Sequence, residues 1–333
     1  LAYLHEFQLD WSSRDERTQI GLGKQELNTP FLNPQDGRMH PSLFEGIWAQ
    51  HRTKHGMLLQ GGWLYRVAPR GASEWYTVDE SMSVFPVGRN VYGEGAKHGE
   101  HLGSAGIFAA GIKQKVHRSV SIIAWNIHTE NIFNSALVQA DAGDRENGWS
   151  ISGLAIKQDA AQVRGCTNDT LLFMPHSESS WAFSGRLRHV LGRFRWQLNY
   201  TRITAHGRYL MPREWGRDPF FTFLPRERNE GAGDVHAATL NLIWKGSNGW
   251  RIQVDGGAYR MPAITDARLN KYAMPSYTQF DVNAQYRFKG GWKGLAAQLL
   301  VLAKLPLDKG LSERQSIHKV DMLHADLIIN YVF

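Results

Sequence analysis

Residues 181–200 read WAFSGRLRHVLGRFRWQLNY, and apolar and polar side chains alternate along this stretch. Large apolar residues occupy one set of alternate positions and polar or charged residues occupy the other, on both sides of residues 190–192. A period of two is typical of a β-strand that has one apolar and one polar face. The stretch therefore predicts a β-hairpin with a short turn at 190–192.

The same alternation recurs from one end of the 333-residue chain to the other. About fifteen segments of roughly ten residues show it, each bounded by turn-forming residues. Further examples are residues 3–11, 239–244, 250–255, 279–288 and 323–333. A soluble sheet of that size would normally split into packed layers. The pattern therefore predicts an antiparallel all-β fold and disfavours a soluble β-sandwich.

The lengths of the connections indicate which all-β fold this is. Short turns are expected at 13–17, 52–56, 114–118, 142–147, 190–192, 246–248 and 289–291. Long loops are expected at 28–42, 68–103, 158–178, 204–233, 260–276 and 304–319, and one connection, at 129–130, is short where a long one is due. Short turns at one rim, long loops at the other and aromatic residues near the strand ends are typical of outer-membrane barrels. We therefore expect a transmembrane antiparallel β-barrel, with residues 1–333 forming a single domain.

The orientation follows if the short turns face the periplasm. The last strand then ends at Phe333 on the periplasmic side, and counting back through the strands puts Leu1 outside the cell. Single-chain bacterial barrels have an even number of strands, because both ends lie in the periplasm. We therefore expect an odd number of strands before Leu1 and a complete barrel of 16 or, preferably, 18 strands.

Composition and missing motifs exclude several other classes. The net charge is +7, but Lys and Arg are scattered along the chain, which disfavours nucleic-acid binding. One cysteine, Cys166, provides neither a disulfide nor a thiolate metal site, and the sequence HGEH at 98–101 lacks the His-Glu-x-x-His spacing of zinc enzymes. No Gly-x-Ser-x-Gly elbow or phosphate-binding loop is present. We expect no enzyme activity, no cofactor and no metal.

Residues 23–46 read GKQELNTPFLNPQDGRMHPSLFEG, and this segment resembles the OprD-type outer-membrane porins. The residues that carry the resemblance are Thr29, Pro30, Asp36, Arg38, Met39, Pro41, Phe44 and Gly46. Residues 212–220, PREWGRDPF, look like the other long pore-folding loop of that family. Tyr331 and the terminal Phe333 resemble the carboxy-terminal signal by which the outer-membrane assembly machinery recognises barrels. The resemblance implies passive diffusion of small hydrophilic solutes, with carboxylates preferred, through a bacterial outer membrane.

Strand alternation suggests which charges face the lumen of such a pore. Five arginines are predicted to point inward: Arg186, Arg188, Arg195, Arg251 and Arg287. Asp255 and Asp281 are predicted to point to the same side. Fixed charges in a narrow water-filled lumen enrich ions of opposite sign, and OprD-type porins guide carboxylates along inward basic residues. The alternative for each arginine is that it only solvates the wall or pairs with a neighbouring aspartate.

The loop 28–42 is expected to fold into the pore and narrow it, with Asp36 and Arg38 at its tip. Three prolines stiffen this loop. Arg38 could instead pair with Asp36 and only anchor the loop. Arg213 and Asp218, together with Glu214 and Arg217, are further candidates for the constriction, whereas the aromatic residues beside them are expected to pack the loop.

The expected partners are small-molecule solutes and outer-membrane lipids, with no nucleic acid. A homo-oligomer or a partner in an envelope complex remains open. The alternative function is a non-conducting barrel that serves as a scaffold or as a subunit of a cell-envelope complex.

Overall fold

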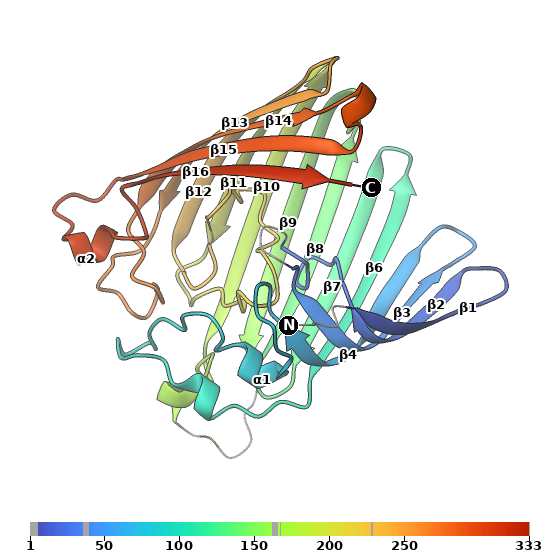
Figure 1. The fold of residues 1–333 in the computed structure, drawn as a ribbon. Coiled ribbons are helices and arrows are strands. Elements are labelled where there is room, and N and C mark those ends of the chain that lie inside the picture. Colours follow the sequence, from blue (N-terminus) through green and yellow to red (C-terminus); the bar gives the residue numbers. More distant parts are fainter. Residues whose placement is uncertain (1–5, 36–39, 162–165, 167, 228, 333) are drawn as a thin grey trace.

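The structure is a computed structural model that describes residues 6–35, 40–161, 166, 168–227 and 229–332. Its main element is one antiparallel sheet of 16 strands, in which strands that follow one another in the chain lie side by side (Figure 1). The strands are β1 (Phe7–Ser12), β2 (Thr18–Gln25), β3 (Leu43–Arg52), β4 (Leu58–Ala68), β5 (Tyr76–Thr77), β6 (Ile107–His117), β7 (Val120–Thr129), β8 (Phe133–Gly143), β9 (Gly148–Ala160), β10 (Ser179–Leu191), β11 (Phe194–Ile203), β12 (Val235–Lys245), β13 (Trp250–Arg260), β14 (Tyr277–Arg287), β15 (Leu295–Pro306) and β16 (Met322–Tyr331).

Helices are few and short in the described part of the chain. They are α1 (Val78–Ser81), α2 (Glu313–Ser316) and the 3-10 turns η1 (His98–Glu100), η2 (Asp169–Leu171) and η3 (Gly290–Trp292). Within the described residues, none of the helices has the length and apolar character that crossing a membrane requires. The chain is therefore an all-β protein, as the alternation predicts.

The strand order confirms the expected topology. β5 pairs only with β4, and the other strands form a continuous antiparallel meander, in agreement with about fifteen segments expected from the alternation. The short and long connections fall where they were expected: β10 and β11 are joined through residues 192–193, and β11 and β12 through residues 204–234. The short connection at 130–132 is also present.

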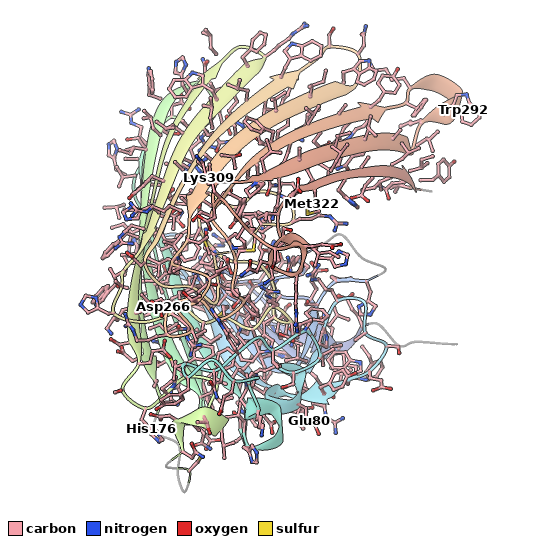
Figure 2. All side chains as sticks on the ribbon, turned by 90° about the vertical axis from the view of Figure 1, so that its left-hand side faces the viewer. Glu80, His176, Asp266, Trp292, Lys309 and Met322 are labelled. Atoms are coloured by element: carbon pink, nitrogen blue, oxygen red, sulfur yellow. The ribbon has the colours of Figure 1, made fainter. Side chains whose placement is uncertain are left out.

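The sheet curves strongly but does not close on itself in the described residues. β1 and β16 are the two ends of the strand order, and they lie apart in Figure 1. Long loops and short turns lie at opposite rims, as the labelled His176 and Trp292 show in Figure 2. The long loops fill the concave side of the sheet (Figures 1 and 2).

The two faces of the sheet have opposite chemistry. On β10 the apolar side chains point to the convex face, where Trp181 is 41% exposed and Phe183 is 45% exposed. Ser184 points to the concave face and is buried beneath a long loop, whose Phe221 N–H donates to its Oγ at 3.0 Å. A soluble protein would bury its apolar face, so an exposed apolar convex face is the arrangement of a wall surrounded by lipid.

Candidate functional site

A polar network crosses four neighbouring strands on the concave face. Arg186 Nε on β10 donates to Asn199 Oδ1 on β11 at 3.0 Å. Asn199 Nδ2 donates to Asn241 Oδ1 on β12 at 2.7 Å, and Asn241 Nδ2 donates to Asp255 Oδ1 on β13 at 2.7 Å. Each partner lies on the adjacent strand of the sheet, so the strand register builds the network. The network links one of the predicted arginines to one of the predicted aspartates.

Two further predicted arginines are held on the same face. Arg251 Nη2 donates to Gln253 Oε1 at 2.7 Å, and Gln253 Nε2 donates to Asp255 Oδ2 at 2.7 Å. Arg188 Nε donates to Ser150 Oγ on β9 at 3.1 Å. A guanidinium carries five N–H donors, so one hydrogen bond of this kind orients the group without using up its donors.

Arg195 completes a group of basic side chains that we call the arginine cluster: Arg186, Arg188, Arg195 and Arg251. Arg195 is half-buried on β11, and the charges of Arg188 and Arg251 act on it. Its buried Nε has no hydrogen-bond partner among the described residues. Arg287 has the same strand parity, but its side chain is exposed at the short-turn end of β14. Its backbone N–H donates to Gly249 O at 3.0 Å. The cluster therefore contains four of the five predicted strand arginines.

The loop 204–234 folds back over this network. The Arg186 guanidinium lies 4.2 Å from the centre of the Phe221 ring. Thr222 Oγ1 is 2.8 Å from Thr201 Oγ1 on β11, and Thr222 O accepts from the Tyr259 hydroxyl on β13 at 2.8 Å. The loop thus narrows the space in front of the arginine cluster.

The loop 26–42 packs against the loop 204–234. Asn33 Nδ2 donates to Arg217 O at 3.1 Å, and its Oδ1 accepts from Arg217 N at 2.9 Å. Ser42 Oγ donates to Glu214 O at 2.9 Å. Asp36 and Arg38, the predicted tip of the first loop, lie outside the described residues. The described parts of both loops are nevertheless on the concave side, where a constriction was expected.

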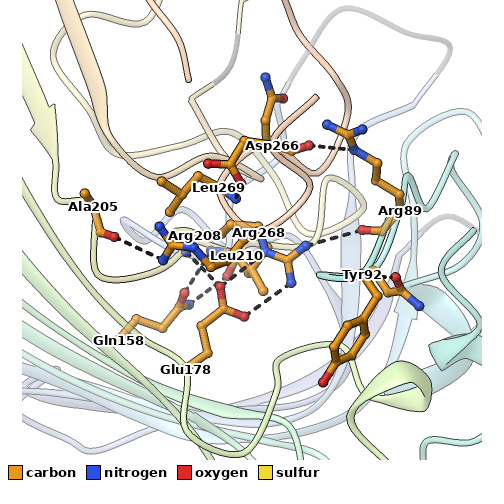
Figure 3. Close-up of polar contacts among 12 residues, drawn as sticks. Arg89, Tyr92, Gln158, Glu178, Ala205, Arg208, Leu210, Asp266, Arg268 and Leu269 are labelled. Carbon is orange, nitrogen blue, oxygen red and sulfur yellow. Dashed lines mark hydrogen bonds and ion pairs between the residues drawn. The ribbon is translucent and has the colours of Figure 1, made fainter. Parts of the chain in front are cut away.

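Buried polar contacts fasten the loop 204–234 to other loops and to the wall (Figure 3). The Arg208 guanidinium, 2% exposed, binds Glu178 through Nε and Nη2, at 3.2 Å each, and its Nη1 donates to Arg89 O at 3.3 Å. The Gln158 side chain on β9 donates to Leu210 O at 2.7 Å and accepts from Leu210 N at 2.8 Å. Three long connections and the sheet therefore meet at Arg208 and Gln158.

The two predicted constriction residues of this loop have structural contacts. Asp218 is 4% exposed, and its Oδ2 accepts from Asn229 N at 2.9 Å and from Glu230 N at 3.1 Å. Arg213 Nε lies 2.5 Å from Glu230 Oε1, and its guanidinium lies over the Tyr272 ring. Burial opposes the charge of Arg213, but the Glu230 carboxylate outweighs it and raises the pKa of the guanidinium. Asp218 thus holds the backbone of the loop, and the charge of Arg213 is paired.

Three of the four aromatic residues at 215–223 are buried, as expected of residues that pack the loop. Trp215, Phe220 and Phe221 are buried, and Trp215 Nε1 donates to Ser81 Oγ at 2.9 Å. Phe223 differs, because it lines the cavity described next, with the Arg217 guanidinium 5.4 Å from its ring centre.

A cavity of about 1240 Å³ lies between these loops and strands β14 to β16. Its basic lining residues are Arg70, Arg89, Arg213, Arg217, Arg226, Lys271, Lys304 and Lys319. Its acidic ones are Glu227, Glu230 and Asp326. The basic lining exceeds the acidic lining, so the cavity favours anions.

Sequence reasoning missed most of this lining. Lys304 interrupts an otherwise apolar strand, and that was the available signal for an inward charge; its Nζ donates to Arg226 O at 2.7 Å. The loop residues gave no such signal, because their position depends on the path of each loop. In the described part of the chain, no three His, Cys, Asp or Glu side chains gather where they could hold a metal ion.

Comparison with known proteins gives the following relatives. Residues 6–153 match the family model described as outer membrane porin, OprD family. Three similar solved structures come from Pseudomonas aeruginosa. OccK8 (OprE) has a TM-score of 0.74 at 14% identity, over 95% of this chain and 77% of that one. OccK3 (OpdO) has a TM-score of 0.72 at 14% identity, over 95% of this chain and 76% of that one. OpdK with vanillate has a TM-score of 0.69 at 15% identity, over 95% of this chain and 75% of that one. Among curated proteins, no match was found.

Proposed function

We propose that this chain, an OprD-type outer-membrane porin by its match over residues 6–153, passes small carboxylate-bearing solutes by passive diffusion. The predicted resemblance, the barrel fold class and the outer-membrane location are confirmed. Members of the family are porins and not enzymes, which confirms the non-enzymatic expectation. The homology supports a channel for small solutes, and the preference for carboxylates is the proposal.

The arginine cluster is the observation that carries this proposal. Its four guanidinium groups share the concave face of β10, β11 and β13, and hydrogen bonds to neutral groups orient three of them. Unlike Arg213, none of the four forms an ion pair among the described residues. Two carboxylates act on them from further away, Asp141, which is already paired with Arg145, and Asp255, so positive charge remains in excess. In a narrow space between low-dielectric walls, such charges raise the local concentration of anions. A carboxylate can also accept two hydrogen bonds from one guanidinium.

The loops supply the second requirement of a selective pore, which is a narrow passage. Phe221 lies directly over Arg186, and the loop 26–42 packs on the same side. A solute passing the cluster must therefore travel close to the guanidinium groups, where screening by water and salt is weakest. We assign Arg186, Arg188, Arg195 and Arg251 to the solute pathway, while Asp36, Arg38 and Arg287 remain predictions.

The test is ion selectivity in planar lipid bilayers. We expect the wild type to conduct with an anion preference, measured as the reversal potential across a KCl gradient. The triple variant Arg186→Gln, Arg188→Gln, Arg195→Gln should lose most of that preference, because three fixed positive charges are removed. The matched control is Arg193→Gln, which removes an exposed arginine in the turn between β10 and β11.

Solute flux tests the carboxylate preference separately. Benzoate and benzamide are similar in size, but only benzoate carries a charge at neutral pH. We expect faster entry of benzoate into proteoliposomes through the wild type, and equal rates through the triple variant. Equal rates through the wild type would refute the carboxylate preference. A folded protein that never conducts would refute the porin proposal and favour the alternative of a scaffold or complex subunit.

A further inference from the structure

A row of three basic side chains lies on the convex face, outside the pore. Arg202 on β11 is in register with His236 on β12, and His236 is in register with Arg260 on β13. Neighbouring strands lie about 4.8 Å apart, so the three residues form a compact row. We call it the outer basic row. Each member is within two residues of a strand end that leads into a long loop.

The alternation of each strand shows that the row faces outward. Thr201, next to Arg202, points to the concave side, where its hydroxyl meets Thr222 of the inner loop. Tyr259, next to Arg260, is fully buried on that same side. Phe183 is in register with Arg202 and is 45% exposed. Below the row, the convex face is apolar and exposed, with Tyr200 at 48% and Leu240 at 45%. The row therefore lies where an apolar band gives way to the long-loop rim, the depth at which lipid headgroups surround a barrel.

The charges around the row leave an excess of positive charge. Arg202 Nη2 is paired with Asp234 Oδ1 at 2.6 Å, and its Nη1 donates to Ile203 O at 2.7 Å. His236 Nδ1 is 2.7 Å from the Tyr200 hydroxyl. The Arg260 side chain is exposed and has no hydrogen bond or ion pair among the described residues. The Asp234 carboxylate thus neutralises the charge of Arg202, and the charge of Arg260 has no counter-charge among the described residues.

Like charges on neighbouring strands repel each other, and Asp234 offsets only one of the two guanidinium groups that flank His236. An anion seated between them removes that repulsion and gains charge-assisted hydrogen bonds. Phe183 beside the row and Tyr200 below it offer an apolar surface to the remainder of the same ligand. A lipid that carries a phosphate above its acyl chains has both features, whereas a free anion has only one.

We propose that the outer basic row binds the phosphate group of a lipid in the outer leaflet, with the acyl chains against Phe183, Tyr200 and Leu240. The proposal rests on the outer-membrane location and not on the solute preference of the pore. The lipid proposal and the solute proposal can therefore fail separately.

The test uses the purified full-length chain in detergent and diphosphorylated lipid A as the probe. The same lipid without its phosphates and free inorganic phosphate are the comparison ligands. Binding is measured by native mass spectrometry as the lipid concentration is raised. We expect binding of the phosphorylated lipid only, and Arg260→Gln should weaken it about tenfold, the factor that 1.4 kcal/mol produces. Because the Arg260 side chain has no partner to lose within the described part of the chain, that variant should fold normally.

Two further variants sharpen the result. Arg193→Gln, at the opposite rim, should bind the lipid like the wild type, and Asp234→Asn should bind it at least as tightly, because a competing carboxylate is removed. Equal binding of the phosphorylated and dephosphorylated lipids would overturn the proposal. So would an Arg260→Gln variant with wild-type affinity, or competition by inorganic phosphate at the concentration at which lipid binds. Unchanged ion selectivity in Arg260→Gln would show that the pore proposal is unaffected.

Discussion

Glu178→Gln should release the loop 204–234 from its neighbours. Glu178 accepts from Arg208 at three points: from the backbone N at 2.8 Å, from Nε at 3.2 Å and from Nη2 at 3.2 Å. Arg208 is 2% exposed and Glu178 is 7% exposed, so the pair is shielded from water. Glutamine keeps one acceptor but leaves the Arg208 charge buried without a counter-charge.

The expected magnitude follows from this geometry. Removing one partner of a buried ion pair costs about 3 to 5 kcal/mol. Glutamine retains the shape and one hydrogen bond, which places the cost near the lower end, about 3 kcal/mol. That energy raises the population of an opened loop by about two orders of magnitude. The sheet itself should be unaffected, because its ladder hydrogen bonds are made by backbone groups and do not involve the Glu178 side chain.

Amide hydrogen exchange followed by mass spectrometry measures the effect. Peptides covering residues 205–211 should exchange faster in Glu178→Gln, while peptides from β10 should not change. The matched control is Asp159→Asn, which breaks the more exposed Lys157 to Asp159 pair and should cost under about 1 kcal/mol. If exchange at 205–211 stayed at the wild-type rate, or rose equally in the control, the ion pair would not be what holds the loop.

Two further predictions concern the same loops. Gln158→Leu should lower the thermal unfolding midpoint in detergent, because it leaves Leu210 N and O unpaired in a buried site, at about 1 to 3 kcal/mol each. The control Gln114→Leu, at a half-buried residue whose side chain only donates to the neighbouring Lys115 O, should lower it less, and equal midpoints would contradict this reasoning. For His98, burial and the nearby Lys271 charge lower the pKa to about 4, so the unfolded chain binds this proton first as the pH falls. The free energy of unfolding should therefore decrease as the pH falls from 6.5 to 4. His98→Gln should remove part of that decrease, whereas His101→Gln should not. Unfolding midpoints measured across this pH range would contradict the reasoning if the wild type and the two variants behaved alike.

The strands were predictable because their signal is local. Apolar residues at alternate positions place Trp181 and Phe183 on one face and Arg186 on the other, whatever the rest of the chain does. The turn between β10 and β11 likewise follows from a few neighbouring residues. The same local rule assigned Arg188, Arg195 and Arg251 to the concave face before their neighbours on other strands were known.

The predicted constriction was less accurate in its details. Asp218 was a further candidate for the constriction, but it is buried and its carboxylate accepts from the backbone of Asn229 and Glu230. Arg213 lines the cavity, but its charge is paired with Glu230, seventeen positions away. Both outcomes depend on how residues 204–234 turn back on themselves. An irregular loop has no period from which the direction of a side chain could be inferred.

The sequence by itself determined the all-β class, the order of strands, the rim at which each connection lies and the face to which each strand side chain points. These follow from side-chain alternation and connection length, which are properties of short segments. Only the tertiary structure decided which groups meet. The path from Arg186 through Asn199 and Asn241 to Asp255 requires a register across four strands, and the Arg208 to Glu178 pair requires two loops to pack together. Contacts between distant segments are set by the packing of the whole sheet and its loops, which no short segment encodes.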